Sequence, residues 1–310
     1  MVMAKLPVVT IGLPFYNAEA TLLDAVRSVF AQTHQDWKLI LMDDGSTDRS
    51  LELARSIRDP RVSVHSDGRN CRLAARLNQI TQLATSEFIA RMDADDLMSP
   101  MRLERQLEFL SVRPDVDLLS TGMYSLTDDY QPAGIRCAPE NHLITPRGLM
   151  TGNAGIVHAS IIGRRSWFSR NPYNEGLEKS QDTNLWVCAF SKGDLAVAFL
   201  PDPLYYYRED GNITKSKLLA AYRVGRYTIL NDAKHRFSVP DRVHALSVNL
   251  GKSMAISFLS GIGRLDVVRR RRNVILIDSS KRERLILEIN RIRLIELPLS
   301  EIKCRQAHVN

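Results

Sequence analysis

Three carboxylates crowd together just after the apolar residues 88–90, and they belong to Asp93, Asp95 and Asp96. Like charges at this density repel one another unless a cation lies among them. A hard divalent cation such as Mg²⁺ binds carboxylate oxygens and still leaves room for substrate phosphates. The alternative is that the cluster only decorates the N-terminus of a following helix, where carboxylates are favourable. The functional interpretation predicts a site for a cation and a phosphate-bearing ligand.

A second acidic pair, Asp43 and Asp44, also follows an apolar run, at residues 39–42. Asp, Gly and Ser at positions 43–46 favour a turn and a helix cap, and this structural role is compatible with ligand binding. Because two acidic clusters follow apolar runs in one region, we expect both to serve the same ligand.

Alternating periodicities in the first 120 residues predict the elements that must position these carboxylates. Short apolar runs typical of buried strands occur at residues 8–13, 37–42, 61–65, 88–92 and 117–121. Segments with apolar residues at helical spacing lie between them and begin near residues 22, 46, 73 and 99. Strands that alternate with helices give right-handed crossovers and a mostly parallel sheet. The predicted fold class is therefore α/β, with a mostly parallel central sheet flanked by helices.

Ligands bind outside the carboxyl ends of the strands in such sheets. Three polar loops lie at expected strand ends, at residues 14–17, 43–46 and 93–96. The geometry of the sheet alone therefore predicts that these loops meet at one crevice.

The composition is that of an ordinary folded protein, with 44% hydrophobic and 25% charged residues. A net charge of +7 and a pI near 9.3 favour anionic partners, and nucleic acid, anionic lipid and nucleotide phosphates all fit. The four cysteines form no C-x-x-C pair, which argues against a zinc site and favours a reducing cytoplasm. We expect no signal peptide, and no window approaches the roughly 20 apolar residues of a spanning helix.

The second half of the chain is less regular. From residue 127 to about 155 Pro and Gly recur, so we expect loops that cross the face of the sheet. Regular structure is expected again at residues 158–163, 183–190 and 195–199. Beyond residue 211 the pattern predicts helices with increasing positive charge.

Several motifs follow one another in a recognisable order. On the first half they are Pro-Phe-Tyr-Asn at 14–17, Ser-Val-Phe-Ala-Gln-Thr at 28–33, Asp-Asp-Gly-Ser-Thr-Asp at 43–48, Leu-Ala-Ala-Arg-Leu-Asn at 73–78 and the stretch 88–96. On the second half they are His-Ala-Ser at 158–160, Arg-Arg at 164–165, Gln-Asp-Thr-Asn-Leu-Trp at 181–186, and Leu-Tyr-Tyr-Tyr-Arg at 204–208 with Gly211 and Asn212. Together, from about residue 7 to 216, these blocks resemble a family 2 glycosyltransferase.

The resemblance implies a GT-A fold that binds a nucleoside diphosphate sugar and transfers the sugar with inversion, assisted by Mg²⁺ or Mn²⁺. Many relatives build bacterial surface polysaccharide or lipopolysaccharide. It also implies a catalytic domain at residues 1–210, with a donor half to about 125 and an acceptor half from about 126. Residues 211–310 would form a basic helical C-terminal extension.

The resemblance also assigns donor-side roles. Asp95 would contact the metal, and Asp93 would reach the metal or the ribose. Asp44 would accept a hydrogen bond from the donor base, in a pocket walled by Pro14 and Tyr16, because a tyrosine offers both a stacking face and a hydroxyl.

Arg76 lies one turn from Arg72 on an expected helix and could approach the diphosphate, although a solvated helix face is the alternative. The chain departs from the family at two positions. Gln181 stands where the family usually has Glu, and Arg72 stands where Gly is common. Neither departure removes a residue that the chemistry requires.

Asp182 is the candidate general base, since a positioned carboxylate that takes the acceptor proton contributes roughly 10²–10⁴ in rate. The structural alternative is an N-cap for the helix expected near Thr183. Trp186 stands at the matching offset on the acceptor side. His158 could orient the acceptor, although a lone histidine beside a buried strand is more often structural.

The last fifth of the chain is strongly cationic, through Arg264, residues 269–272, Lys281, Arg282, Arg284, Arg291 and Arg293. Isoleucines recur among these charges at positions 286, 289, 292 and 295. This pattern predicts either a peripheral membrane helix, favoured by about 1 kcal/mol per basic residue near anionic lipid, or a helix packed on the catalytic domain. Nucleic-acid binding is not expected, because no aromatic residues are interleaved and no binding module is recognisable.

We therefore expect a cytoplasmic, metal-dependent, inverting glycosyltransferase of hexosyltransferase type, working at the inner face of the membrane on a glycan or lipid-linked acceptor. The donor is expected to be UDP-linked. One alternative is a non-catalytic sugar-nucleotide-binding or assembly protein, for which Gln181 is the only hint. Another is a sugar nucleotidyltransferase, which the glycine-free loop at 14–17 disfavours.

Overall fold

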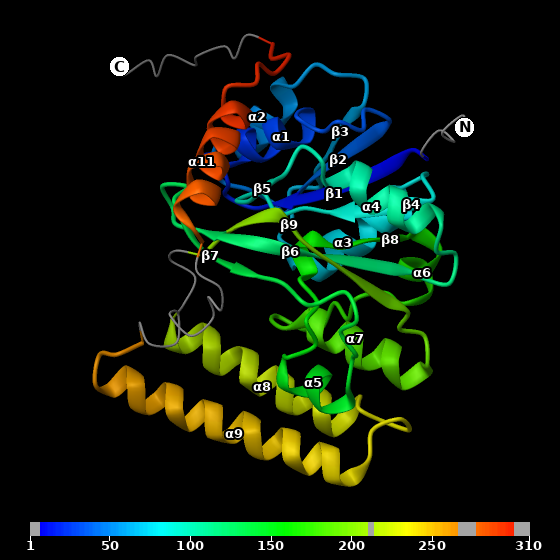
Figure 1. The fold of residues 1–310 in the computed structure, drawn as a ribbon, viewed down its shortest axis with the longest axis vertical. Coiled ribbons are helices and arrows are strands. Elements are labelled where there is room, and N and C mark those ends of the chain that lie inside the picture. The colour runs from blue at the N-terminus through cyan, green and yellow to red at the C-terminus, as the bar shows by residue number, and fades with distance from the viewer. Residues whose placement is uncertain (1–6, 210–213, 266–276, 301–310) are drawn as a thin grey trace.

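The computed structural model describes residues 7–209, 214–265 and 277–300, and its centre is one nine-stranded sheet (Figure 1). The strands are β1 Val9–Phe15, β2 Trp37–Asp43, β3 Val62–His65, β4 Phe88–Arg91, β5 Leu97–Met98, β6 Leu118–Leu126, β7 Pro132–Arg136, β8 Ile162–Arg164 and β9 Val197–Arg208. The helices are α1 Leu22–Phe30, α2 Ser50–Ser56, α3 Arg72–Leu83, α4 Arg102–Ser111, α5 Pro146–Thr151, α6 Arg165–Arg170, α7 Gln181–Lys192, α8 Lys215–Asn231, α9 Val239–Gly261 and α11 Ser279–Arg293, with a 3₁₀ turn at His158–Ser160.

The strand order is β3-β2-β1-β4-β8-β6-β9-β5, and β7 pairs with β6 at the side. The four strands β3, β2, β1 and β4 are parallel, so their carboxyl ends lie at one edge. In the second half β8 runs antiparallel to β4 and β6, whereas β6 and β9 are parallel. The predicted α/β fold is confirmed, and its sheet is mixed, with the parallel pairing concentrated in the first half.

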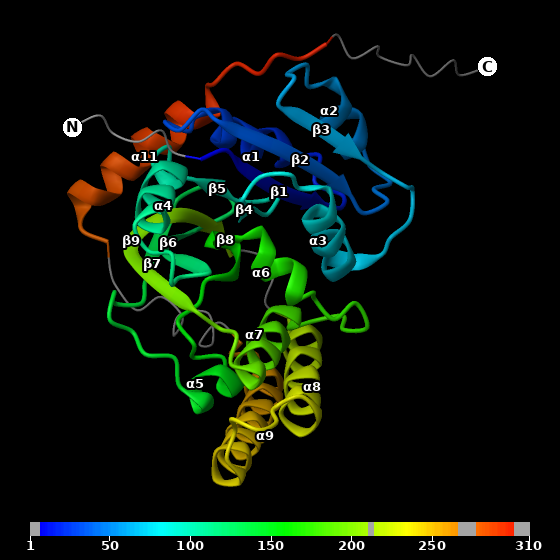
Figure 2. The same cartoon turned by 90° about the vertical axis from the view of Figure 1, so that its right-hand side faces the viewer.

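Helices cover both faces of the sheet (Figure 2). One core contains apolar side chains of α1 and α4 packed on the sheet, and the other contains those of α3, α6 and α7. Strands buried on both faces explain why β1 and β2 are almost continuous apolar runs rather than alternating ones.

The expectation that residues 127–155 are only loops was wrong for two short elements. β7 begins at Pro132 and pairs on one side only, a place where a missing N–H costs nothing. α5 has Thr145 as N-cap, with its hydroxyl accepting from Gly148 N, and Pro146 in its first turn. Gly152 then ends the helix at φ 77°, in the left-handed region that glycine adopts without strain.

In the part of the chain that the structure describes, three helices follow β9, and they separate into two groups. α8 and α9 pack against each other and against α5 and α7, below the sheet in Figure 1. α11 returns to the opposite side and lies beside α1. Among the described residues, no helix is long and apolar enough to cross a membrane.

The apolar stripe predicted on the last helix faces the protein. Leu285, Ile289 and Ile292 are buried against Tyr206 and other residues of the sheet. Of the two alternatives for this stripe, packing on the sheet domain is therefore the one that the structure shows. The basic run 269–272 lies outside the described residues.

Candidate active site

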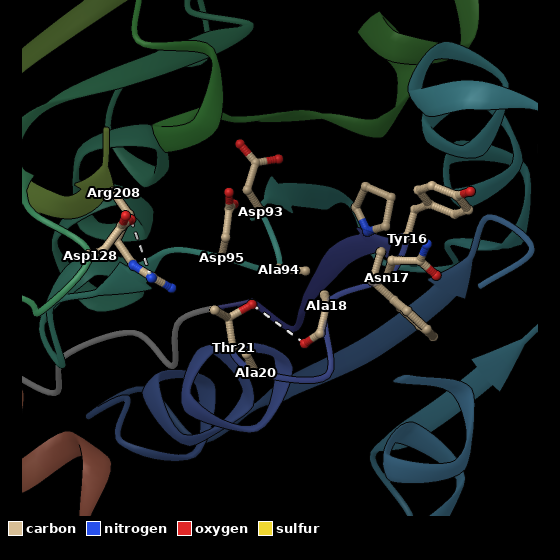
Figure 3. A pocket seen from close by; sticks show the side chains of 12 residues that line it. Tyr16, Asn17, Ala18, Ala20, Thr21, Asp93, Ala94, Asp95, Asp128 and Arg208 are labelled. Carbon is tan, nitrogen blue, oxygen red and sulfur yellow. Dashed lines mark hydrogen bonds and ion pairs between the residues drawn. The ribbon is translucent and has the colours of Figure 1, made fainter. Parts of the chain in front are cut away.

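The carboxyl ends of β1 and β4 border a cavity of about 350 Å³. Its walls are formed by residues 14–18, Ala20 and Thr21 on one side, by residues 93–95 at the base, and by Asp128 and Arg208 on the other side. Figure 3 shows the Asp93 and Asp95 side chains between Tyr16 and Arg208. Two of the three loops predicted to meet at a crevice line this cavity, and the third is bonded to its wall, since Asp44 N donates to Phe15 O at 2.8 Å.

The three clustered aspartates have different surroundings. Asp96 is buried and accepts hydrogen bonds from Tyr205 Oη and Arg208 N, both at 2.8 Å. Asp93 is half-buried and accepts from the Arg91 guanidinium at 2.6 Å. Asp95 is exposed in the cavity, and no side chain among the described residues donates a hydrogen bond to its carboxylate.

The local field shows that this cluster carries excess negative charge. Desolvation of the Asp95 carboxylate by the surrounding protein and repulsion from Asp93 raise the pKa of Asp95 to about 6. Burial, followed by Asp95 and Asp93, raises the pKa of Asp96 well above its ordinary value. β5 separates the cluster from α4, so it does not decorate a helix N-terminus. That structural alternative was wrong.

The donor set fits a Mg²⁺ or Mn²⁺ ion held jointly with a ligand. The described residues contain no group of three or more His, Cys, Asp or Glu side chains arranged to hold a metal by themselves. Mg²⁺ commonly uses one or two carboxylates and completes its shell with phosphate oxygens and water. Asp93 and Asp95, side by side in a cavity with room for a ligand, match that pattern.

Asp44, at the end of β2, has hydrogen-bond donors from the protein itself. Its carboxylate accepts from Cys71 N at 2.8 Å, from Arg72 N at 3.1 Å and from Arg76 Nε at 2.9 Å. Arg76 also forms an ion pair with Asp67 at 2.7 Å, and its side chain is only 1% exposed. The solvated helix face considered for Arg76 was wrong, and its predicted donor role stays a prediction.

The neighbouring loops are fixed by turns. Asp43 accepts from Ser46 N at 2.9 Å and from Ser66 Oγ at 2.7 Å. Asn17, at φ 49°, accepts from Thr47 N at 2.8 Å through its side chain. These bonds hold the ends of β1 and β2 together and leave the Tyr16 ring half exposed at the cavity wall.

Asp182 lies in the first turn of α7, two residues after the N-cap Ser180. The predicted alternative that Asp182 itself is the N-cap was therefore wrong. Burial raises the pKa of Asp182 above its ordinary value, whereas the positive charge of Arg91 opposes that rise. Arg91 is also the partner of Asp93, so this one guanidinium acts electrostatically on both carboxylates.

His158 and Trp186 form a packed aromatic group beside Asp182. The ring centroids of His158 and Trp186 are 5.8 Å apart, and His158 Nε2 lies 2.7 Å from Tyr173 Oη. Burial and Arg91 lower the pKa of His158 well below its ordinary value, so the ring is neutral at pH 7. Trp186 is 4% exposed and belongs to the core, and the packing of His158 against it supports the structural alternative for His158.

Arg208 is a cavity residue to which the sequence alone assigned no role. Its Nη2 lies 3.5 Å from Asp128 Oδ1, and its guanidinium lies 4.9 Å from the centre of the Tyr130 ring. Its buried Nε has no hydrogen-bond partner among the described residues. The sequence signal that could have pointed to Arg208 is its position at the end of the Tyr-Tyr-Tyr-Arg motif.

Comparison with known proteins identifies relatives of this chain. The family model described as glycosyl transferase family 2 matches residues 10–175, more than half of the chain. EpsE of Bacillus subtilis (strain 168), which carries the name of a glycosyltransferase, is 30% identical over 240 residues, covering 76% of this chain and 84% of EpsE. WfgD of Escherichia coli, a UDP-Glc:alpha-D-GlcNAc-diphosphoundecaprenol beta-1,3-glucosyltransferase, is 26% identical over 188 residues, covering 61% and 72%.

Two solved structures share the fold. Residues 1–349 of Staphylococcus aureus TarS in complex with UDP match 80% of this chain and 72% of that one, with a TM-score of 0.59 and 19% identity. The mannosyltransferase PcManGT from Pyrobaculum calidifontis, in complex with GDP-Man and Mn²⁺, matches 93% of this chain and 87% of that one, with a TM-score of 0.58 and 15% identity. At these identities the likeness concerns the fold.

Proposed function

The chain belongs to glycosyl transferase family 2, and we propose that it moves a hexosyl group from a UDP-sugar to a hydroxyl of a growing surface glycan, with inversion at the anomeric carbon. The observation that carries this proposal is that Asp93 and Asp95 lie together in a cavity at the carboxyl ends of β1 and β4. Asp182 does not line this cavity, but it is close enough to Arg91, the partner of Asp93, for the Arg91 charge to act on its pKa. A UDP donor is inferred from WfgD, whose name specifies UDP-Glc, and from TarS, whose structure contains UDP.

In the proposed complex the donor lies along the edge formed by β2, β1 and β4. Asp44 accepts a hydrogen bond from the base, and Pro14 and Tyr16 wall the base pocket. Arg76 holds the Asp44 carboxylate in place through its ion pair at 2.9 Å. Arg208 donates to the diphosphate, because its guanidinium lies on the cavity wall and its Nε has no protein partner among the described residues.

Asp93 and Asp95 would hold the Mn²⁺ or Mg²⁺ together with the diphosphate, and the bound ion would neutralise the negative charge that develops on the leaving group. Arg208 adds a second positive charge at the same end of the donor. Asp96 keeps the cluster in place from below, through its bonds to Tyr205 and to the backbone of Arg208.

Asp182 acts as the general base. The acceptor hydroxyl oxygen attacks the anomeric carbon, its proton passes to an Asp182 carboxylate oxygen, and the bond between the anomeric carbon and the diphosphate breaks on the opposite side. The raised pKa of Asp182 makes it a stronger base than an exposed aspartate.

The acceptor is proposed to be lipid-linked, as the name of WfgD states for that protein. Such an acceptor would place the enzyme on the cytoplasmic side, at the inner face of the membrane. Of the helices after residue 210, α8 and α9, which pack with α5 and α7, then belong functionally to the acceptor side of the enzyme.

A thermal-shift screen of nucleotide sugars, with and without Mn²⁺, tests the proposal. We expect UDP-sugars to raise the melting temperature more with Mn²⁺, and the same mixtures to release UDP slowly by donor hydrolysis. Absence of both binding and hydrolysis across a broad panel would overturn the enzyme assignment. Binding without any turnover, in the presence of acceptor lipid, would favour the non-catalytic alternative.

A further inference from the structure

The outer face of α9 is apolar although it is exposed. Six large side chains on it are each 51–69% exposed: Val239, Val243, Leu250, Met254, Phe258 and Ile262. Their spacing of four or seven residues keeps them along one side of the helix. We call these six residues the α9 apolar face.

The fold itself does not explain this face. The opposite side of α9 already packs on the protein through buried Ala245, Asn249 and Ile256. A helix with large apolar side chains on two opposite sides is normally covered on both sides. The acidic residue of α9, Asp241, lies in the first turn and is paired with Arg147 at 2.6 Å, so the apolar face carries no carboxylate.

The segment that carries this face has a strongly positive net charge. Residues 214–265, which contain α8 and α9, have nine Lys and Arg and only two Asp, a net charge of +7. The whole chain has 42 Lys and Arg and 35 Asp and Glu, also +7, so all other residues together are formally neutral. On α8, Arg223 is exposed on the same side of the helix as Tyr227 and Leu230.

We propose that α8 and α9 dock on an anionic bilayer, with the α9 apolar face entering the headgroup region. An exposed apolar helix face within a segment of strongly positive net charge is typical of interfacial helices. The net charge favours an anionic bilayer over a second copy of the chain, because two such regions would bring like net charges of +7 together.

The position of α8 and α9 relative to Asp182 relates the docking to the proposed reaction. A small cavity of about 140 Å³ is lined by Ser180 and Thr183, which flank Asp182, and by residues of α8 and α9 including Tyr222 and Lys252. In Figure 1, α7 lies between the sheet and these helices. Docking would therefore bring the acceptor side against the lipid. This last step rests on the proposed function, whereas the docking itself does not.

Co-sedimentation of the full chain with vesicles tests the inference. We expect strong binding to phosphatidylcholine vesicles that contain phosphatidylglycerol, weak binding to phosphatidylcholine alone, and a decrease as salt is raised. The double variant Met254→Glu/Phe258→Glu should bind at least roughly tenfold more weakly, because charges replace two inserted apolar groups. The matched control is Val112→Glu/Leu143→Glu, two side chains 74% and 80% exposed elsewhere, which should bind like the parent protein.

Three results would overturn the inference. One is equal vesicle binding by Met254→Glu/Phe258→Glu and the parent protein, and another is equal binding to neutral and anionic vesicles. The third is a dimer of the parent protein, detected by light scattering, that becomes a monomer in this variant. An unchanged melting temperature and unchanged UDP binding establish that the variant is folded. Donor hydrolysis, measured without lipid, reports on the proposed function separately.

Discussion

The two acidic clusters at the ends of β2 and β4 look alike in sequence but have opposite environments. The protein itself supplies the donors for Asp43 and Asp44, including backbone N–H groups and the buried guanidinium of Arg76. The Arg91 guanidinium donates to Asp93, whereas Asp95 faces the cavity without a side-chain donor among the described residues and has a pKa raised to about 6. The first cluster is completed by the fold, whereas the second retains charge that a ligand must balance.

This difference separates carboxylates whose charge the fold balances from carboxylates that keep charge for a ligand. In Asp44 the oxygen proposed to accept a hydrogen bond from the donor base is Oδ2, which among the described residues accepts only the 3.1 Å bond from Arg72 N. A carboxylate already satisfied by the protein keeps a loop rigid at little cost, and its loss should reduce stability. A carboxylate held without a full set of partners costs stability and serves binding or catalysis, as at many functional sites. Asp182 belongs to the second class, because burial raises its pKa as well.

The largest effect is expected at Asp182, the member of the unsatisfied class that we place at the acceptor. Asp182→Asn should lower kcat by roughly 10²–10⁴-fold, because the acceptor hydroxyl loses its base. Donor affinity, measured by calorimetry with UDP and Mn²⁺, should stay close to that of the parent protein. An equal loss of donor binding and turnover would remove Asp182 from the role of base.

A substitution of Arg76 tests the carboxylates whose hydrogen-bond donors the protein itself supplies. Arg76→Met should lower the free energy of unfolding by about 3–5 kcal/mol, since it leaves the buried Asp44 carboxylate without its charged partner. Arg72→Met, one turn earlier, is the matched control. Its ion pair with Glu178 joins two exposed side chains, so it should cost less than about 1 kcal/mol. Equal losses in denaturant unfolding would contradict the distinction.

The pH dependence of turnover follows from the direction of the Asp182 pKa shift. Only the ionised carboxylate accepts a proton, so kcat/KM should fall about tenfold per pH unit below a pKa that lies above 3.8. The pH dependence of stability has the opposite sign. The contribution of Asp182 to stability is fully present below its unfolded pKa and is lost as the pH rises through its raised folded pKa. A rate that stays constant down to pH 4 would rule out this assignment.

The smallest effect is expected at Asp95 in the absence of ligand. Asp95→Asn should raise the free energy of unfolding at neutral pH by roughly 1 kcal/mol or less, because it relieves repulsion from Asp93 at an exposed position. Asp44→Asn should lower it. Thermal melts of both variants without metal measure the two signs, and a lower melting temperature for Asp95→Asn would place Asp95 in the satisfied class.

The sequence was most informative where polar residues follow the carboxyl ends of strands. The alternation of apolar runs predicted β1 to β4, and the rule that ligands bind at carboxyl ends brought residues 14–17 and 93–96 to one cavity. The sequence could not show that Arg76 is buried, because a charged residue on a helix normally faces solvent. Arg76 is buried because Asp44 lies where it can pair with the guanidinium, and this position is known only from the structure.

The sequence also could not show contacts between segments that are far apart along the chain. Arg208 N bonds to Asp96, 112 residues earlier, and the cavity wall that they complete depends on how β9 pairs with its neighbours. β7 was missed because an edge strand that begins with proline lacks a strong apolar pattern. Of the predicted isoleucine stripe, Ile289 and Ile292 are buried in α11, whereas Ile286 is half-buried and Ile295 lies beyond the end of the helix. The burial of the stripe against Tyr206 required the tertiary structure.

The central claim is that Asp93 and Asp95 bind the donor diphosphate through a divalent cation. Calorimetric titration of UDP into the parent protein and into Asp95→Asn, each with and without Mn²⁺, tests it most directly. We predict that Mn²⁺ strengthens UDP binding at least about tenfold, or 1.4 kcal/mol, in the parent protein, and that Asp95→Asn loses this gain. UDP affinity that is the same with and without Mn²⁺ in the parent protein, or a full gain retained by Asp95→Asn, would contradict the claim.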